Sequence, residues 1–171
     1  MRNGRYQSDS SECWYRDDVL HREDGPAVIN PDASYWYING HLHREDGPAV
    51  EWKDGGKEWW LKGKRHREGG PAVLYPDGSY AWYQNDVRHR IGGPAIQTAS
   101  STSAWFIDGL LHRVDGPALL LDDGSKEWYL FGLKCSKDFF DYIYSQTTIL
   151  VAEPVVVENH ILSLRKKFFN R

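Results

Sequence analysis

Short runs of apolar and aromatic residues alternate with turn-forming residues along most of the chain, and they recur at a fixed step. The tryptophans mark this step, at positions Trp14, Trp36, Trp59, Trp82, Trp105 and Trp128. A second motif, His-Arg-x-x-Gly-Pro-Ala, keeps the same step and starts at His21, His43, His66, His89 and His112. A constant period of this size indicates stacked copies of one small unit, each burying its face only against its neighbours. The pattern therefore predicts an extended array that offers a surface rather than a pocket.

The third copy shows which elements one repeat is predicted to contain. Trp59–Leu61 is rich in strand-forming side chains, and Lys62-Gly63 separates it from a return strand at Lys64–Arg67. In other copies Asn-Gly or Asp-Gly takes the Lys62-Gly63 position, and these dipeptides favour the positive φ angles of a two-residue hairpin turn. After a Gly-Gly-Pro break, Ala72–Tyr75 is expected to be another short strand and Pro76–Ser79 a turn. No copy shows a helical apolar period.

Copies joined in this way predict an antiparallel meander with one hairpin per repeat. Equivalent residues would then lie two strands apart, roughly 9–10 Å at the usual strand spacing. The first copy is one residue shorter, and the simplest place for the loss is the turn Pro31–Ser34, where strand register is preserved. In the fourth copy, Ala99–Thr102 replaces the Asp-Gly turn of its neighbours.

Three segments are predicted. Residues 1–11 form a polar N-terminal segment, residues 12–134 form five and a half β-hairpin repeats, and residues 135–171 form a helical cap. The fold class is thus mainly β, an elongated antiparallel β-hairpin array with a short α-helical C-terminal cap. Trp14 is expected at the open end of the array, with a neighbouring repeat on one side only.

The cap is expected to cover the last open sheet edge, as atypical ends of repeat arrays do. Cys135 stands where the other copies have histidine, and Ser136 is placed to N-cap a helix over Lys137–Tyr144. Glu158–Phe169 has apolar residues at helical spacing and predicts a second helix. Val155–Val157 is either a strand or the first turn of that helix.

Composition narrows the choice of compartment and partner. The 171 residues carry a net charge of −3, so no polyanion partner is expected and no nucleic-acid binding is predicted. Cys13 and Cys135 lie at opposite ends of the array, and two lone thiols suit a reducing cytoplasm better than a disulfide framework. The polar start and the lack of a long apolar run predict a soluble, unsecreted chain.

The hairpin segments resemble the MORN repeat. Lys62–His66 and Asn39–His43 carry the resemblance, each with an aromatic residue three positions before its glycine. The 23-residue step and the turn Tyr75–Gly78 agree with it, and the match covers about residues 12–132. The chain departs from the family where Arg-x-x-Gly-Pro-Ala follows the histidine. The resemblance implies a hairpin-repeat fold and protein–protein scaffolding, sometimes lipid contact, and rarely catalysis by the repeats.

The repeated histidines do not predict a metal site. Zinc ligands must come within about 2.0–2.1 Å of one ion, whereas equivalent histidines would stand roughly 9–10 Å apart. The simpler interpretation is that each imidazole packs beside a tryptophan and hydrogen-bonds a turn backbone. The arginines are expected to pair with acids or to shield the sheet edge. Five divergent copies do not form one convergent catalytic site, so no enzyme, cofactor, metal or small-molecule substrate is predicted.

The functional prediction depends on pairs of adjacent aromatic residues, in which a second aromatic residue follows each repeated tryptophan. If the tryptophan column faces one side of a sheet, the aromatic residue after each tryptophan faces the other. That second ladder either is exposed and binds a partner, or is buried where the sheet coils. On the first alternative, the predicted partner-binding residues combine the ladder with two copy-specific aromatics: Trp60, Tyr83, Trp52, Tyr75, Tyr37 and Phe106.

The functional prediction is a non-enzymatic repeat protein that binds another protein through its extended sheet surface. It would act as an adaptor or a stoichiometric inhibitor, for example a viral inhibitor of a host complex. One alternative is a carbohydrate or cell-wall-binding protein that stacks sugars on its aromatic rings. Another is a membrane-surface module, suggested by the resemblance and by the basic residues Arg165–Lys167 and Arg171.

Overall fold

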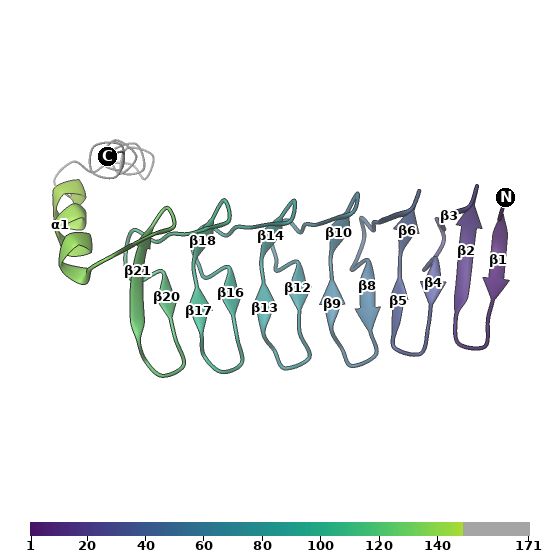
Figure 1. The fold of residues 1–171 in the computed structure, drawn as a ribbon, viewed down its shortest axis with the longest axis horizontal. Coiled ribbons are helices and arrows are strands. Elements are labelled where there is room, and N and C mark those ends of the chain that lie inside the picture. Colours follow the sequence, from purple (N-terminus) through teal and green to yellow (C-terminus); the bar gives the residue numbers. More distant parts are fainter. Residues whose placement is uncertain (149–171) are drawn as a thin grey trace.

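One long antiparallel sheet runs the length of the molecule in the computed structural model, which describes residues 1–148 (Figure 1). Within these residues the sheet has 14 strands, and β3 (Val19–Leu20) pairs with β2 beside the main path. The strand order along that path is β1 (Gly4–Gln7), β2 (Glu12–Arg16), β4 (Val28–Ile29), β5 (Ala33–Tyr35), β8 (Val50–Trp52), β9 (Lys57–Glu58), β12 (Val73–Leu74), β13 (Tyr80–Ala81), β16 (Ile96–Gln97), β17 (Ser103–Ala104), β20 (Leu119–Leu120), β21 (Lys126–Leu130) and β22 (Leu133–Cys135).

Each central repeat also contains a second, smaller hairpin that leaves the main sheet. The described residues form four two-stranded sheets of this kind: β6–β7 (Tyr37–Ile38 and His41–Leu42), β10–β11 (Trp60–Leu61 and Lys64–Arg65), β14–β15 (Tyr83–Gln84 and Val87–Arg88) and β18–β19 (Phe106–Ile107 and Leu110–Leu111). The elongated hairpin array is confirmed, but the expectation of one hairpin per repeat is wrong. The turns after Trp52, Tyr75 and Leu121 connect main-sheet strands, whereas the turns equivalent to Lys62-Gly63 close the small hairpins along the upper edge of Figure 1.

In the four central copies the chain leaves the main sheet at the repeated tryptophan: Trp36, Trp59, Trp82 and Trp105. The backbone N–H of Trp59 donates to the carbonyl of Ala72 at 2.8 Å, and its own carbonyl accepts from the N–H of His66 at 3.0 Å. The next residue, Trp60, instead offers its carbonyl to Arg44 of the preceding repeat at 3.1 Å. The main sheet and the small hairpins are therefore both hydrogen-bonded from one repeat to the next. Each repeat depends on its neighbours for backbone hydrogen-bond partners.

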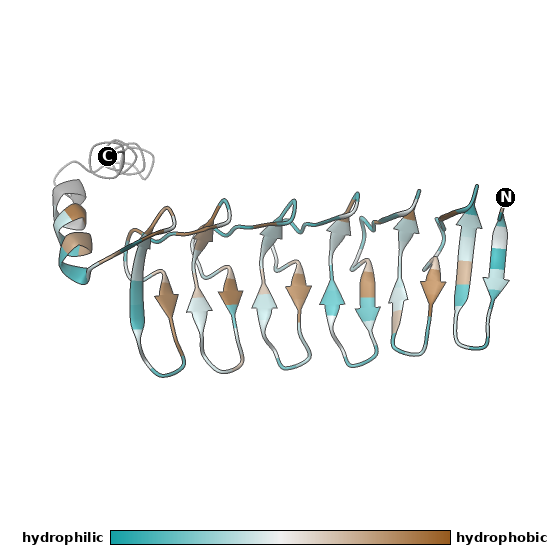
Figure 2. Ribbon diagram, viewed as in Figure 1, coloured by the Kyte–Doolittle hydropathy of each residue, from teal (hydrophilic) through white to brown (hydrophobic). Residues whose placement is uncertain are grey.

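The core is thin and is built mainly from small side chains. The alanine of every His-Arg-x-x-Gly-Pro-Ala motif is fully buried, at 0% exposure: Ala27, Ala49, Ala72, Ala95 and Ala118. Val50, Val73 and Ala81 share one row of paired strand positions and are also buried. Figure 2 shows apolar β4, β12, β16 and β20 alternating with more polar return strands. No large side chain among the described residues is fully buried, so the array depends on backbone pairing and close contact of small residues.

The main-sheet turns follow the expected pattern, including its two exceptions. In the first copy the N–H of Asn30 bonds the carbonyl of Ala33, whereas in the second Trp52 bonds Gly56, one residue further on. The missing residue therefore lies in the turn, and strand register is kept as predicted. In the fourth copy Ser101 adopts a φ of 75° at the position that glycine fills in the second, third and fifth copies. This backbone region is costly for a residue with a Cβ.

The two ends of the array differ. At the C-terminal end, helix α1 (Lys137–Thr148) packs Phe140 and Ile143 against Leu130. The predicted N-cap is confirmed, because Ser136 Oγ accepts the N–H of Phe139 at 3.2 Å. The helix is longer than predicted. The second predicted helix, Glu158–Phe169, and the segment Val155–Val157 lie outside the described residues.

At the N-terminal end, β1 lies within the segment predicted only as polar and adds a strand beyond β2. Arg5 pairs directly with Trp14, so the expectation that Trp14 has a neighbour on one side only is wrong. Within residues 1–148, no helix is both long and apolar enough to cross a membrane.

Candidate functional site

The repeated arginine lies over the repeated tryptophan of its own copy. The distance from the arginine Cζ to the ring centroid is nearly constant: 4.1 Å for Arg22–Trp14, 4.3 Å for Arg44–Trp36, 3.8 Å for Arg67–Trp59, 4.2 Å for Arg90–Trp82 and 4.1 Å for Arg113–Trp105. A guanidinium at this distance from an aromatic face makes a cation–π contact. The arginine therefore covers the tryptophan column on its outer side.

The remaining motif residues hold the guanidinium in place. Arg44 Nη1 donates to the carbonyl of Pro48 at 3.2 Å, and its Nε donates to Asp46 at 2.9 Å. A Cβ added to Gly47 would lie 2.9 Å from Arg44 Cζ, so only glycine leaves room for the guanidinium. The proline contact recurs in all five copies, whereas the aspartate contact is present in the first, second and fifth. The Arg-x-x-Gly-Pro residues thus form a loop in which the proline carbonyl binds the arginine side chain of the same motif.

The repeated histidine connects each copy to the next. Its Nδ1 accepts a backbone N–H from the small-hairpin turn one repeat further on, at 3.0 Å for His21–Asn39, 3.1 Å for His43–Lys62, 3.3 Å for His66–Asn85, 3.2 Å for His89–Asp108 and 3.1 Å for His112–Phe131. An accepting Nδ1 places the proton of the neutral ring on Nε2. The predicted hydrogen bond to a turn backbone is confirmed, and the contact with the tryptophan ring is made by the arginine.

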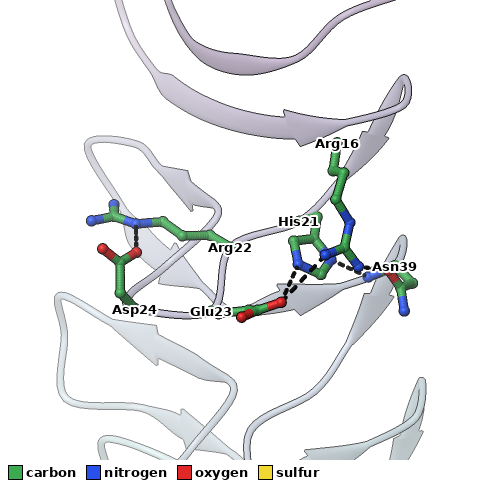
Figure 3. A network of polar contacts seen from close by, with 6 residues as sticks. All are labelled: Arg16, His21, Arg22, Glu23, Asp24 and Asn39. Carbon is green, nitrogen blue, oxygen red and sulfur yellow. Dashed lines mark hydrogen bonds and ion pairs between the residues drawn. The ribbon is translucent and has the colours of Figure 1, made fainter.

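Figure 3 shows this arrangement in the first copy. His21 Nε2 is 3.2 Å from Glu23 Oε1, and the same carboxylate oxygen accepts from Arg16 Nη1 at 3.3 Å. On the other side of the loop, Arg22 bonds Asp24 and holds the pKa of that carboxyl below its ordinary value. The acids of this string are therefore engaged in ion pairs that hold the loop together.

The histidine and arginine columns do not converge on a reaction centre. Equivalent residues are separated by two strands of the sheet order, which is about 9–10 Å. Among residues 1–148, no group of three or more His, Cys, Asp or Glu side chains is placed to hold a metal ion. Burial lowers the pKa of His112 to about 4, which keeps that ring neutral and accepting. The motif side chains therefore stabilise the array.

The six predicted partner-binding residues fall into two groups. Tyr83 is buried, at 7% exposure, in a core cluster with Ala72, Val73 and Ala81, so it does not offer the exposed anchor that was predicted. The other small-hairpin aromatics are half-buried: Tyr37, Trp60 and Phe106. The second ladder is consequently mostly covered. Tyr83, at the start of a small hairpin, packs on Val73 and Ala81 of the main sheet.

The two copy-specific aromatics are exposed. Trp52 is 38% exposed and Tyr75 is 51% exposed, and they occupy equivalent positions at the ends of β8 and β12. The Trp52 ring makes an edge contact with Tyr35, with ring centroids 5.8 Å apart. Trp52 is opposite the small residue Ala33 in the strand register.

The exposed aromatics lie next to the edge formed by the main-sheet turns, which we call the turn edge: residues 30–33, 52–56, 75–79, 98–102 and 121–125, at the bottom of Figure 1. Aspartates occupy these turns at Asp32, Asp54, Asp77, Asp122 and Asp123. The backbone N–H of Ser79 donates to the Asp77 carboxylate and is the main reason why the pKa of that carboxyl lies below its ordinary value. The Ser79 side chain lowers the same pKa further. No salt bridge within residues 1–148 joins these turn carboxylates to a basic side chain. The turn edge is therefore negatively charged.

Another exposed apolar residue lies on the opposite edge, which we call the motif edge: the His-Arg-x-x-Gly-Pro-Ala loops and the small hairpins. Ile91 is 82% exposed where the first three copies carry glutamate. Val87 and Leu110 on the neighbouring small hairpins are 41% exposed. The sequence carries a signal for this residue, since the fourth copy has Ile91-Gly92 where the first two copies have Glu-Asp.

Comparisons with known proteins give no further assignment. No protein-family model matches the sequence, and a comparison with curated proteins finds no match.

Proposed function

We propose that this protein is a non-enzymatic repeat scaffold that binds another protein through residues particular to single copies. The observation that carries the proposal is the division of the side chains. The motif and tryptophan side chains are engaged within the array: the five arginine–tryptophan contacts close each copy, and the five histidine hydrogen bonds connect it to the next. Exposed rings remain at Trp52 and Tyr75, where the copies differ. Exposed Trp and Tyr are the side chains most often found as interface anchors.

The elongated surface suits an adaptor or a stoichiometric inhibitor, and a viral inhibitor of a host complex is one concrete form of it. The resemblance to MORN repeats implies the same class of function. Cys13 and Cys135 are both free, which supports a reducing compartment such as the cytoplasm. With a net charge of −3, the chain has no electrostatic attraction for nucleic acid or for an anionic membrane.

Carbohydrate binding is the second candidate function. Exposed aromatic rings side by side on a sheet can stack sugar rings, and Trp52 and Tyr75 are the residues that would do so. The charged turns beside them favour a protein partner, because oppositely charged surfaces steer association and select partners.

The test is a double substitution, Trp52→Ala with Tyr75→Ala, in the full chain. Affinity capture from the native host followed by mass spectrometry identifies candidate partners, and each is then purified and titrated directly. We expect the double variant to lose binding while its melting temperature stays near that of the parent. The matched control is Tyr142→Ala on helix α1, another exposed ring at 58% exposure, which should bind normally. Binding that survives the double substitution, or specific binding to a glycan array, would contradict the proposal.

A further inference from the structure

Two features coincide on the turn edge of the first three repeats. The exposed rings Trp52 and Tyr75 stand on adjacent copies, and each of the first three turns carries an aspartate, at Asp32, Asp54 and Asp77. Both features are interrupted at the fourth copy, where Thr98 takes the aromatic position and Ser100 the aspartate position; the fifth turn has aspartates again but Leu121 in place of the ring. An exposed ring and a turn aspartate therefore occur together in the second and third copies, beside the aspartate of the first.

The rings and carboxylates are in contact with the same backbone. A Cβ added to Gly56 would meet Trp52 Cδ1 at 3.1 Å and Asp54 Oδ1 at 3.2 Å, so the ring and the carboxylate flank one glycine. The backbone N–H of Lys53 donates to the carbonyl of Asp32 at 2.8 Å and joins the first turn to the second. The aromatic and acidic side chains thus form one continuous surface.

The charge of this surface is not neutralised by the described residues. No salt bridge within residues 1–148 involves Asp32, Asp54 or Asp77, whereas Asp24 and Asp46 on the motif edge pair with arginines at 2.8 and 2.9 Å. The Asp54 and Asp77 side chains each accept one backbone N–H, which leaves further acceptor capacity on both carboxylates. Lys53 is the one basic residue in these three turns. The surface is therefore complementary to a positively charged partner.

The spacing of the turns matches one particular backbone conformation. Consecutive turns lie two strands apart, about 9.4–9.8 Å at normal strand spacing. A polyproline II helix repeats every three residues with a rise of about 3.1 Å per residue, which is about 9.3 Å per turn. Every third side chain of such a segment would face successive turns. Surfaces lined by exposed aromatic rings are also the usual binding sites for polyproline II segments.

We infer that the turn edge of repeats one to three binds a proline-rich, polyproline II segment of a partner protein that carries Lys or Arg at every third position. The basic side chains pair with Asp32, Asp54 and Asp77, and the prolines or the guanidinium planes pack on Trp52 and Tyr75. This inference rests on the proposed function, because it specifies the chemistry of the protein partner at the same surface.

The first experiment measures the affinity of synthetic peptides for the full chain by isothermal titration calorimetry. The probe is five Arg-Pro-Pro repeats; the controls are five Glu-Pro-Pro repeats and a peptide of the same composition with its arginines clustered. We expect the periodic arginine peptide to bind most tightly and to weaken as salt is raised, since surface charge pairs are screened within about 10 Å at 0.1 M salt. Equal affinity for the periodic and clustered peptides, or for the glutamate peptide, would overturn the inference.

The second experiment removes charge without breaking the turns. At Asp54 and Asp77 asparagine keeps the side-chain oxygen that accepts the turn N–H. In the first turn that acceptor is Asn30, which stays unchanged. The triple variant Asp32→Asn, Asp54→Asn, Asp77→Asn should therefore fold normally and bind the periodic peptide about tenfold more weakly. The matched control is Asp122→Asn with Asp123→Asn in the fifth turn, where Asp123 accepts the N–H of Ser125 at 2.8 Å in the same way. That control should bind normally. Equal weakening by both variants would show a general field effect and would overturn the inference.

The two proposals can fail separately. If a purified natural partner loses binding to the Trp52→Ala, Tyr75→Ala variant but binds the triple asparagine variant normally, protein binding stands and the basic polyproline II segment is rejected. If the partner keeps its affinity for both variants, both proposals are rejected.

Discussion

The motif edge and the turn edge are built from the same repeats, yet they use their side chains in opposite ways. On the motif edge, Arg44 lies on Trp36, bonds Pro48 and pairs with Asp46, while His43 accepts a backbone N–H from the next copy. On the turn edge, aspartates take part in no described salt bridge, and aromatic rings stand exposed at Trp52 and Tyr75.

The difference shows what repetition means in this chain. A contact needed by every copy must be repeated in every copy, so the invariant residues are those that close each copy or connect it to its neighbour. The copy-specific residues do not make these shared contacts, and we propose that a particular partner is recognised there. The most conspicuous motif of the sequence is consequently the least informative about binding.

The largest pH effect is expected at His112, on the motif edge. Its pKa is lowered by burial from 6.5 to about 4 in the folded protein. Between these pH values the unfolded chain binds more protons, so the stabilising contribution is complete above about pH 6.5 and is lost as the pH falls towards 4. The loss is on the order of 3 kcal/mol. Urea unfolding at pH 7 and pH 4.5 measures it.

The control for this prediction is His112→Asn, whose side-chain oxygen can accept the N–H of Phe131 without titrating in this range. We expect the variant to lose less stability than the parent between pH 7 and pH 4.5. Identical pH dependence in the two proteins would show that His112 does not contribute.

A smaller loss of stability is expected when a methyl group is added beside the arginine of the motif loop. Gly47→Ala places a Cβ 2.9 Å from Arg44 Cζ and should lower the free energy of unfolding by about 1–3 kcal/mol. Gly47 does not have a positive φ, so backbone strain does not enter. In an Arg44→Ala background the same substitution should cost clearly less, because the crowded group is gone. Additive costs in the double-mutant cycle would mean that the guanidinium is not what the glycine accommodates.

A gain in stability is expected on the turn edge. Ser101 has a φ of 75°, and Ser101→Gly should raise the free energy of unfolding by about 0.5–1 kcal/mol, since glycine adopts this region without steric cost. The reverse change, Gly78→Ser at a φ of 85°, should lower it by a similar amount. Peptide binding at repeats one to three should be unaffected by Ser101→Gly. A destabilised Ser101→Gly variant would contradict this account of the turn.

Sequence reasoning was most successful where a feature depends on local spacing. The period predicted the array, Ser136 predicted the start of α1, and the missing residue of the first copy was placed in the correct turn. These features follow from turn chemistry and from a strand period of two, both of which are local.

Sequence reasoning failed where a feature depends on how neighbouring copies pack. The burial of Tyr83 follows from the small hairpin leaving the main sheet, which the alternation of residues does not show. The placement of arginine on tryptophan joins residues eight positions apart in the third copy, Trp59 and Arg67, through a folded loop. The N-terminal strand β1 is short and polar, so it has little apolar pattern to reveal it.

The most direct test of the division between the two edges is the free energy of unfolding, measured in urea, of Trp82→Ala and Tyr75→Ala in otherwise identical chains. Trp82 lies beneath Arg90 in the middle of the array, and its loss should cost about 3 kcal/mol or more. Tyr75, at 51% exposure on the turn edge, should cost less than about 0.5 kcal/mol. Comparable losses for the two variants would contradict the account, because the exposed ring would then belong to the framework of the array.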